Sequence, residues 1–85
     1  GDMIQVWSND RFKAPLHRVL KSSVNTRYSA PYFYNPSYAT ICKPLLPNSN
    51  ESVFNPVPWQ EFRSGRAAGD YADQGEEIQI SWYRK

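Results

Sequence analysis

The chain has 85 residues, which is enough for one small domain or for a piece of a larger one. Hydrophobic residues make up 40% of it, and three Trp, six Tyr and four Phe are aromatic, so the composition predicts a buried core and excludes a disordered tail. Ten basic and eight acidic residues are interspersed and leave a net charge of +2, which gives no basis for binding nucleic acid or an anionic membrane surface.

A single cysteine, Cys42, excludes an intramolecular disulfide framework. The chain has no signal-peptide pattern, and no apolar run is long enough to span a membrane. Together these features predict a soluble protein in a reducing, cytoplasmic setting.

Three strands are predicted in the first half of the chain, over residues about 2–8, 13–20 and 27–34. Turn-forming residues bound the first strand, and both of its faces carry apolar groups, as in a strand packed on two sides. Alternation along the third strand places Arg27 and Ser29 on one face.

A helix is predicted over residues about 59–68, after a loop rich in proline. Pro58 suits the start of this helix and Gly69 suits its end. Residues about 77–83 predict an extended tail. The fold class is therefore mostly β with one C-terminal helix, and so few short strands leave a sheet that another part of the fold, or another chain, has to cover.

The chemistry available is limited by the single histidine, His17. The chain cannot build a complete zinc site from the usual ligands, because it lacks paired histidines or cysteines. A Ser-His-Asp triad is formally possible, but nothing resembles a nucleophile elbow. The four glycines are too far apart for a phosphate-binding loop.

The remaining candidates are His17 together with Arg27 and Ser29, which follow it by ten and twelve residues. Taken alone, a histidine in an apolar strand is more often structural than ligating. An arginine at a strand start is usually solvated or ion-paired. Both of these readings stay open on the pattern alone.

The surrounding sequence closely resembles the C-terminal half of the 2-oxoglutarate- and iron(II)-dependent dioxygenases, in their isopenicillin-N-synthase-like branch. The likeness lies in the stretches Gly1–Asp10, Pro15–Val19, Arg27–Phe33, Asn35–Tyr38, Gly69–Asp73 and Glu76–Ile80. It implies a double-stranded β-helix, or jelly roll, in which two histidines and a carboxylate hold iron and leave positions open for 2-oxoglutarate and oxygen. His17 matches the distal histidine of that iron site. Arg27 and Ser29 match the pair that binds the far carboxylate of 2-oxoglutarate.

The resemblance implies an oxidoreductase that couples oxidative decarboxylation of 2-oxoglutarate, to succinate and carbon dioxide, to oxidation of a small organic substrate. In the family the other two iron ligands come from an H-x-D motif that lies upstream of the residues matched here. We therefore expect a partial jelly roll that is incomplete without the N-terminal portion of the same fold, and we expect the 85-residue chain alone to be inactive.

A second hypothesis comes from a different functional class. The missing H-x-D motif and the many aromatic side chains also suit a non-catalytic β module that binds a partner chain through its aromatic surface. A small basic nucleic-acid binder is disfavoured, because nothing in the charge pattern supports it.

Overall fold

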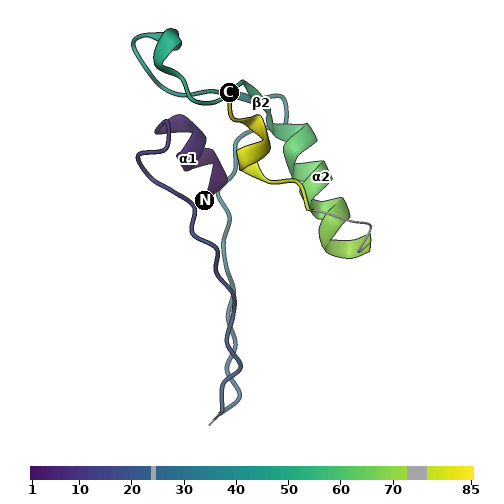
Figure 1. Cartoon of the computed structure of the whole chain (residues 1–85). Coiled ribbons are helices and arrows are strands. Elements are labelled where there is room, and N and C mark those ends of the chain that lie inside the picture. Colours follow the sequence, from purple (N-terminus) through teal and green to yellow (C-terminus); the bar gives the residue numbers. More distant parts are fainter. Residues whose placement is uncertain (24, 73–76) are drawn as a thin grey trace.

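The computed structural model describes residues 1–23, 25–72 and 77–85, so Asp73 and Glu76 of the family-like tail lie outside the described ranges. In chain order the elements are helix α1 (Asp2–Trp7), strand β1 (Ile41–Cys42), the 3-10 turn η1 (Ser49–Glu51), strand β2 (Val57–Pro58), helix α2 (Trp59–Ala72) and the 3-10 turn η2 (Ile80–Tyr83). Figure 1 shows these elements gathered at one end of the molecule. Residues 12–23 and 25–37 project from that end and are called the arm below.

Strand pairing is confined to a very small sheet. β1 and β2 are antiparallel, with Ile41 opposite Pro58 and Cys42 opposite Val57. An isolated bridge between Phe54 and Arg84 brings the C-terminal residues beside the loop that joins the two strands. The described residues thus hold two short strands and two α-helices, and the predicted mostly β architecture is not what they form.

A hydrophobic core lies where α1, the small sheet, α2 and η2 meet. Its buried members come from all of these elements and are Val6, Cys42, Phe54, Val57, Trp59, Phe62 and Ile80. Met3, Ile78 and Tyr83 are partly buried against this cluster. Burial of this apolar surface is the main favourable contribution to the fold, since the strands are too short to supply many ladder hydrogen bonds.

The strand predicted over residues 2–8 is wrong, because Asp2–Trp7 form α1. Helical spacing turns Met3 and Val6 together towards the core, whereas Ile4 is 44% exposed. Asp2 lies in the first turn, where a negative charge favours the helix dipole. In a strand, period-two alternation would place Ile4 on the same face as Val6, but a strand also needs a paired neighbour along its edge.

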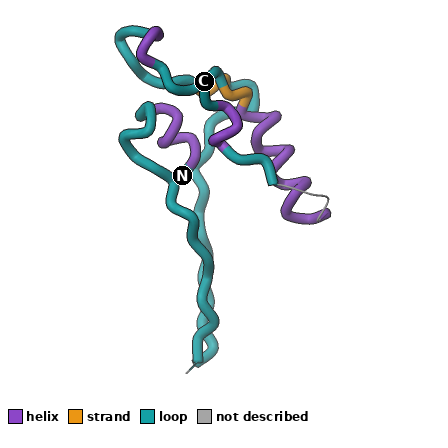
Figure 2. The backbone as a smooth tube through the Cα atoms, in the orientation of Figure 1, coloured by secondary structure: helices purple, strands orange, loops and turns teal. Residues whose placement is uncertain are grey.

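The strands predicted over 13–20 and 27–34 are also not formed. Both segments are extended but carry no strand ladder, and Figure 2 shows them as loop along the whole arm. The arm makes the molecule elongated, with a longest dimension of 51 Å against 28 and 22 Å. Its apolar side chains are exposed, for example Tyr28 at 93%. Strand alternation is stabilised by burial of one face, and no described residue covers either face of the arm.

Helix α2 begins at Trp59, as predicted, and continues past the predicted end to Ala72. Gly69 does not end the helix. Gly65 and Gly69 instead leave room for the C-terminal tail, because a Cβ at Gly65 would lie 3.3 Å from Ile78 and a Cβ at Gly69 would lie 3.4 Å from Glu77. The tail therefore lies directly against the helix, through the side chain of Ile78 at Gly65 and through the Cα and side chain of Glu77 at Gly69.

The tail predicted as extended over 77–83 is a 3-10 turn in its second half, Ile80–Tyr83. Three residues per turn place Ile80 and Tyr83 on the same side. Ile80 is buried, and the ring of Tyr83 packs edge-on against Phe62 with centroids 6.2 Å apart. An extended tail would have turned these two side chains to opposite faces.

Phe62 is the side chain on which this packing converges. It is fully buried, its ring centroid lies 5.6 Å from that of Trp59, and the Arg66 guanidinium lies 5.4 Å above it. We expect Phe62→Ala to lower the free energy of unfolding by about 3–5 kcal/mol, which is a large part of the stability of a small domain. Denaturant unfolding followed by tryptophan fluorescence measures this change. Phe12→Ala is the matched control, since Phe12 is 66% exposed and its loss should change stability by less than about 0.5 kcal/mol.

Candidate active site

His17 lies near the base of the arm, with its ring exposed. Its Nδ1 lies 2.8 Å from the carbonyl oxygen of Pro15. Since a carbonyl oxygen only accepts hydrogen bonds, Nδ1 must carry the proton and donate, and the lone pair of the neutral ring then lies on Nε2. Metal-ligating histidines commonly have this arrangement, in which the second nitrogen donates to a carbonyl and fixes the tautomer.

Arg27 and Ser29 lie on the returning half of the arm and are exposed. The Nη2 of Arg27 donates to the carbonyl of Leu20 at 3.2 Å, which joins the two halves of the arm. Two cavities are lined by His17, and neither of them is lined by Arg27 or Ser29. The structure therefore places all three predicted site residues on the arm without bringing them to one cavity.

The cavity that His17 lines together with Arg66 has a volume of about 490 Å³. It lies between the base of the arm, α1, α2 and the C-terminal tail, and its charged wall consists of Asp2, Arg66 and Glu77. The guanidinium of Arg66 is bonded through Nη1 to Asp2 at 2.5 Å and through Nε to Glu77 at 2.9 Å. Its Nη2 donates to the side-chain oxygen of Gln79 at 3.3 Å. Arg66 thus ties α1, α2 and the tail together around this cavity.

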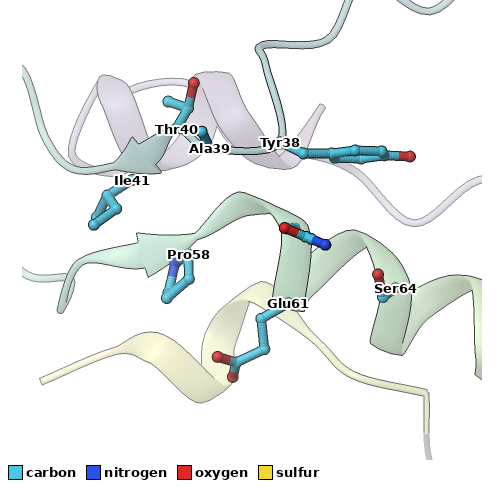
Figure 3. A pocket seen from close by; sticks show the side chains of 8 residues that line it. Tyr38, Ala39, Thr40, Ile41, Pro58, Glu61 and Ser64 are labelled. Carbon is cyan, nitrogen blue, oxygen red and sulfur yellow. The ribbon is translucent and has the colours of Figure 1, made fainter.

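A second hollow of about 520 Å³ lies on the other side of α2 and is drawn in Figure 3. Figure 3 shows Glu61 turned away from Tyr38 and towards η2. Glu61 accepts a hydrogen bond from the Tyr83 hydroxyl at 3.3 Å. Burial, together with the Glu61 carboxylate, raises the pKa of Tyr83 above its ordinary value. This hydrogen bond holds η2 against α2.

The fit of a metal ion can be tested on the residues present. His17 fits as one ligand, because its Nε2 is left with a free lone pair. Among residues 1–23, 25–72 and 77–85, no group of three or more His, Cys, Asp or Glu side chains is close enough to hold a metal ion. The described residues therefore supply one imidazole and no complete metal site.

Sequence reasoning missed the charged residues of the cavity wall. Asp2 and Arg66 are 64 residues apart, so no local spacing indicates that they pair. It also missed Gln5, a polar residue within the apolar run Met3–Trp7, although a polar side chain in such a run is itself a signal of a specific hydrogen bond.

Comparisons with known proteins bear directly on the three arm residues. Residues 1–36 match the model of the 2OG-Fe(II) oxygenase superfamily, and this range includes His17, Arg27 and Ser29. The chain matches part of a 2-oxoglutarate/Fe(II)-dependent oxygenase. The resemblance recognised in the sequence is thus confirmed at the level of the superfamily.

Similar curated proteins include several plant oxygenases. The chain is 36% identical to gibberellin 2-beta-dioxygenase 1 of Pisum sativum, over 86% of this chain and 23% of the relative. It is 38% identical to 1-aminocyclopropane-1-carboxylate oxidase of Musa acuminata, over 91% and 25% respectively. It is 34% identical to gibberellin 2-beta-dioxygenase 5 of Oryza sativa, over 99% and 25%. The chain thus spans about a quarter of the length of these relatives. No solved structure matches it significantly.

This oxygenase family is enzymatic, and its members are oxidoreductases. The superfamily name specifies 2-oxoglutarate and Fe(II), and the relatives named as dioxygenases add O2, so these are the cofactor and co-substrates that the match implies. In the described part of the chain, no helix is long and apolar enough to cross a membrane.

The tautomer of His17 can be tested directly, because it is the only histidine in the sequence. We expect the neutral ring to carry its proton on Nδ1, since that nitrogen donates to the Pro15 carbonyl. A long-range ¹H–¹⁵N correlation spectrum of the ¹⁵N-labelled chain, recorded at alkaline pH, distinguishes the two nitrogens. Urea-unfolded protein provides the reference, and a folded spectrum with the proton mainly on Nε2 would contradict the assignment.

Proposed function

We propose that this chain is a C-terminal part of an oxygenase that couples oxidative decarboxylation of 2-oxoglutarate to oxidation of a small organic substrate. Within it, His17 is one iron ligand, and Arg27 and Ser29 anchor the far carboxylate of 2-oxoglutarate. The observation that carries the proposal is the match of residues 1–36 to the 2OG-Fe(II) oxygenase superfamily, over a range that contains all three residues in the order expected of the family. We assign the chain to the isopenicillin-N-synthase-like branch on the stretches quoted above.

The chemistry of the three side chains supports these roles. A neutral imidazole with its lone pair on Nε2 is a good ligand for Fe(II). The guanidinium of Arg27 is a planar, permanently charged fork that suits a carboxylate, and the hydroxyl of Ser29 adds another donor. Iron and 2-oxoglutarate supply the oxidising chemistry when they are bound, and the protein binds and orients them.

The exposed arm supports the view that a further part of the same fold completes the site. Its aromatic side chains Tyr28, Tyr32, Phe33 and Tyr34 are all exposed. A surface of this kind marks an interaction site in a soluble protein. We assign the role of covering this surface to the N-terminal portion of the jelly roll, which would also supply the remaining iron ligands. The 85-residue chain alone is accordingly predicted to be inactive.

The same exposed side chains favour the second candidate, a non-catalytic β module that binds a partner chain through its aromatic surface. The residues that precede Gly1 in the full-length polypeptide distinguish the two functions. An H-x-D motif upstream supports the oxygenase, and its absence supports the binding module. Under either function the setting is expected to be cytoplasmic, with no role in binding nucleic acid.

The iron-ligand role predicts a specific effect of His17→Ala in the full-length polypeptide. We expect Fe(II) binding to weaken by at least about 100-fold and 2-oxoglutarate decarboxylation to be lost, because one of three protein ligands is removed. Equilibrium dialysis measures the binding, and release of labelled carbon dioxide measures the turnover. Decarboxylation at the wild-type rate in this variant would remove His17 from the site.

The carboxylate-anchor role predicts that Arg27→Ala mainly weakens 2-oxoglutarate binding. The loss of a charge-assisted hydrogen-bonding pair corresponds to about a 10- to 100-fold increase in its dissociation constant, with Fe(II) affinity unchanged. Titration calorimetry of the iron-loaded full-length protein measures this. Arg11→Ala is the matched control, since Arg11 is an exposed arginine before the arm. Equal affinities in the two variants would argue against an anchor at Arg27.

A further inference from the structure

The arm exposes both apolar side chains and unpaired backbone groups. No backbone amide in residues 12–23 or 25–37 donates to the backbone carbonyl of another described residue. The two halves are joined instead through the side chain of Arg27, which donates to the Leu20 carbonyl. The exposed large apolar side chains lie on both halves and are Phe12, Leu16, Val19, Leu20, Tyr28, Tyr32, Phe33 and Tyr34. An extended segment of this kind offers amide hydrogens, carbonyl oxygens and apolar contacts together, and a partner strand can use all three along its length.

Charge is distributed unevenly between the arm and the rest of the chain. The arm holds four basic residues, Lys13, Arg18, Lys21 and Arg27, and no acidic residue. All eight acidic residues and the other six basic residues lie outside it. The four basic side chains of the arm are exposed, and none of the three ion pairs between described residues includes one of them. The chain is nearly balanced in charge overall, but the arm is positively charged.

These features distinguish between the classes of partner that could cover the arm. Two copies of this chain paired along their arms would bring eight basic side chains together with no carboxylate between them, and like charges on facing strands are destabilising. The phosphates of single-stranded nucleic acid would neutralise the charge, but they only accept hydrogen bonds and cannot pair with the carbonyl oxygens of an extended segment. A polypeptide strand supplies donors and acceptors in alternation, and carboxylates on it complement the basic side chains. The arm therefore fits an acidic strand best.

We propose that the arm is a docking surface for an acidic polypeptide strand, which pairs with its backbone and places carboxylates beside Arg18 and Lys21. Neither residue belongs to the proposed iron or 2-oxoglutarate site. The docked strand would supply the paired neighbour that the segments 13–20 and 27–34 lack. That this strand belongs to the N-terminal portion of the oxygenase rests on the proposed function, whereas the chemistry of the partner rests on the arm alone.

The first test titrates the 85-residue chain with two synthetic peptides of about eight residues and blocked ends, one alternating valine with glutamate and the other valine with lysine. Amide chemical shifts of the ¹⁵N-labelled chain measure the binding. At low salt we expect the glutamate peptide to bind at least about tenfold more tightly and to slow amide exchange along the arm. Salt at about 0.5 M should bring the two affinities within about threefold of each other, since exposed charges are then screened. Equal affinities at low salt, or no binding of either peptide at millimolar concentration, would overturn the proposal.

Charge reversal on the arm locates the contact. In the double variant Arg18→Glu, Lys21→Glu we expect the preference to invert, so that the lysine peptide binds more tightly than the glutamate peptide. Lys43→Glu, Lys85→Glu is the matched control, because it makes the same change in net charge at two exposed lysines outside the arm. It should keep the preference for the glutamate peptide. The same loss of preference in both double variants would show a response to net charge alone and would overturn the assignment to the arm.

Two further measurements test the other occupants. Sedimentation of the 85-residue chain at low salt should show a monomer, and a dimer that the control variant keeps and Arg18→Glu, Lys21→Glu loses would assign the arm to a second copy instead. An oligothymidylate of about eight nucleotides should bind more weakly than the glutamate peptide. Tighter binding of the oligonucleotide would overturn the proposal in favour of nucleic acid.

Failure of the proposed function has a different signature from failure of this inference. If the proposed function is wrong, His17→Ala in the full-length polypeptide still decarboxylates 2-oxoglutarate, while the short chain keeps its preference for the glutamate peptide. If the docking surface is wrong, the short chain shows no such preference, whatever the effect of His17→Ala.

Discussion

Packing around Phe62 holds the described structure together. Its ring contacts the ring of Trp59, at the start of the same helix, and the ring of Tyr83, in the C-terminal turn. The Arg66 guanidinium lies over it. Because Arg66 also pairs with Asp2 and Glu77, the same region fixes α1 and the tail against α2. Ion pairs at this degree of exposure contribute little to the free energy of unfolding. Burial of apolar side chains therefore provides most of the stabilisation, and the ion pairs fix how α1 and the tail lie against α2.

The molecule consists of a packed end, formed by α1, the small sheet, α2 and η2, and of the exposed arm. The packed end buries its apolar side chains, while the arm exposes a series of aromatic residues. All three residues proposed to bind iron and 2-oxoglutarate lie on the arm, and Gln5 of α1 accepts a hydrogen bond from the backbone of Ala14 at its base. In the proposed enzyme, the packed end would therefore act as the support from which the ligand-bearing segment enters the rest of the jelly roll.

Prediction from the sequence succeeded where the structure depends on local residue patterns. It failed where an element needs another segment to pack or pair with it. The start of α2 at Trp59 agrees with the prediction made from Pro58. The strands over 13–20 and 27–34 depended on burial of one face, which no described residue provides. The assignment of His17, Arg27 and Ser29 came from family resemblance, whereas Arg66 was found only through its contact with Asp2, 64 residues away.

By itself, the sequence indicated the resemblance to the oxygenase superfamily, the order of the candidate ligand and anchor residues, and the start of the main helix, because these depend on residue identity and short-range spacing. Only the structure showed that residues 2–7 are helical, that Gly65 and Gly69 leave room for the tail, and that Nδ1 of His17 faces the carbonyl oxygen of Pro15. The first two depend on contacts between separate segments, namely core contacts for Met3 and Val6 and the close approach of Ile78 and Glu77 to the glycines, whereas the imidazole contact depends on the backbone conformation two residues before it.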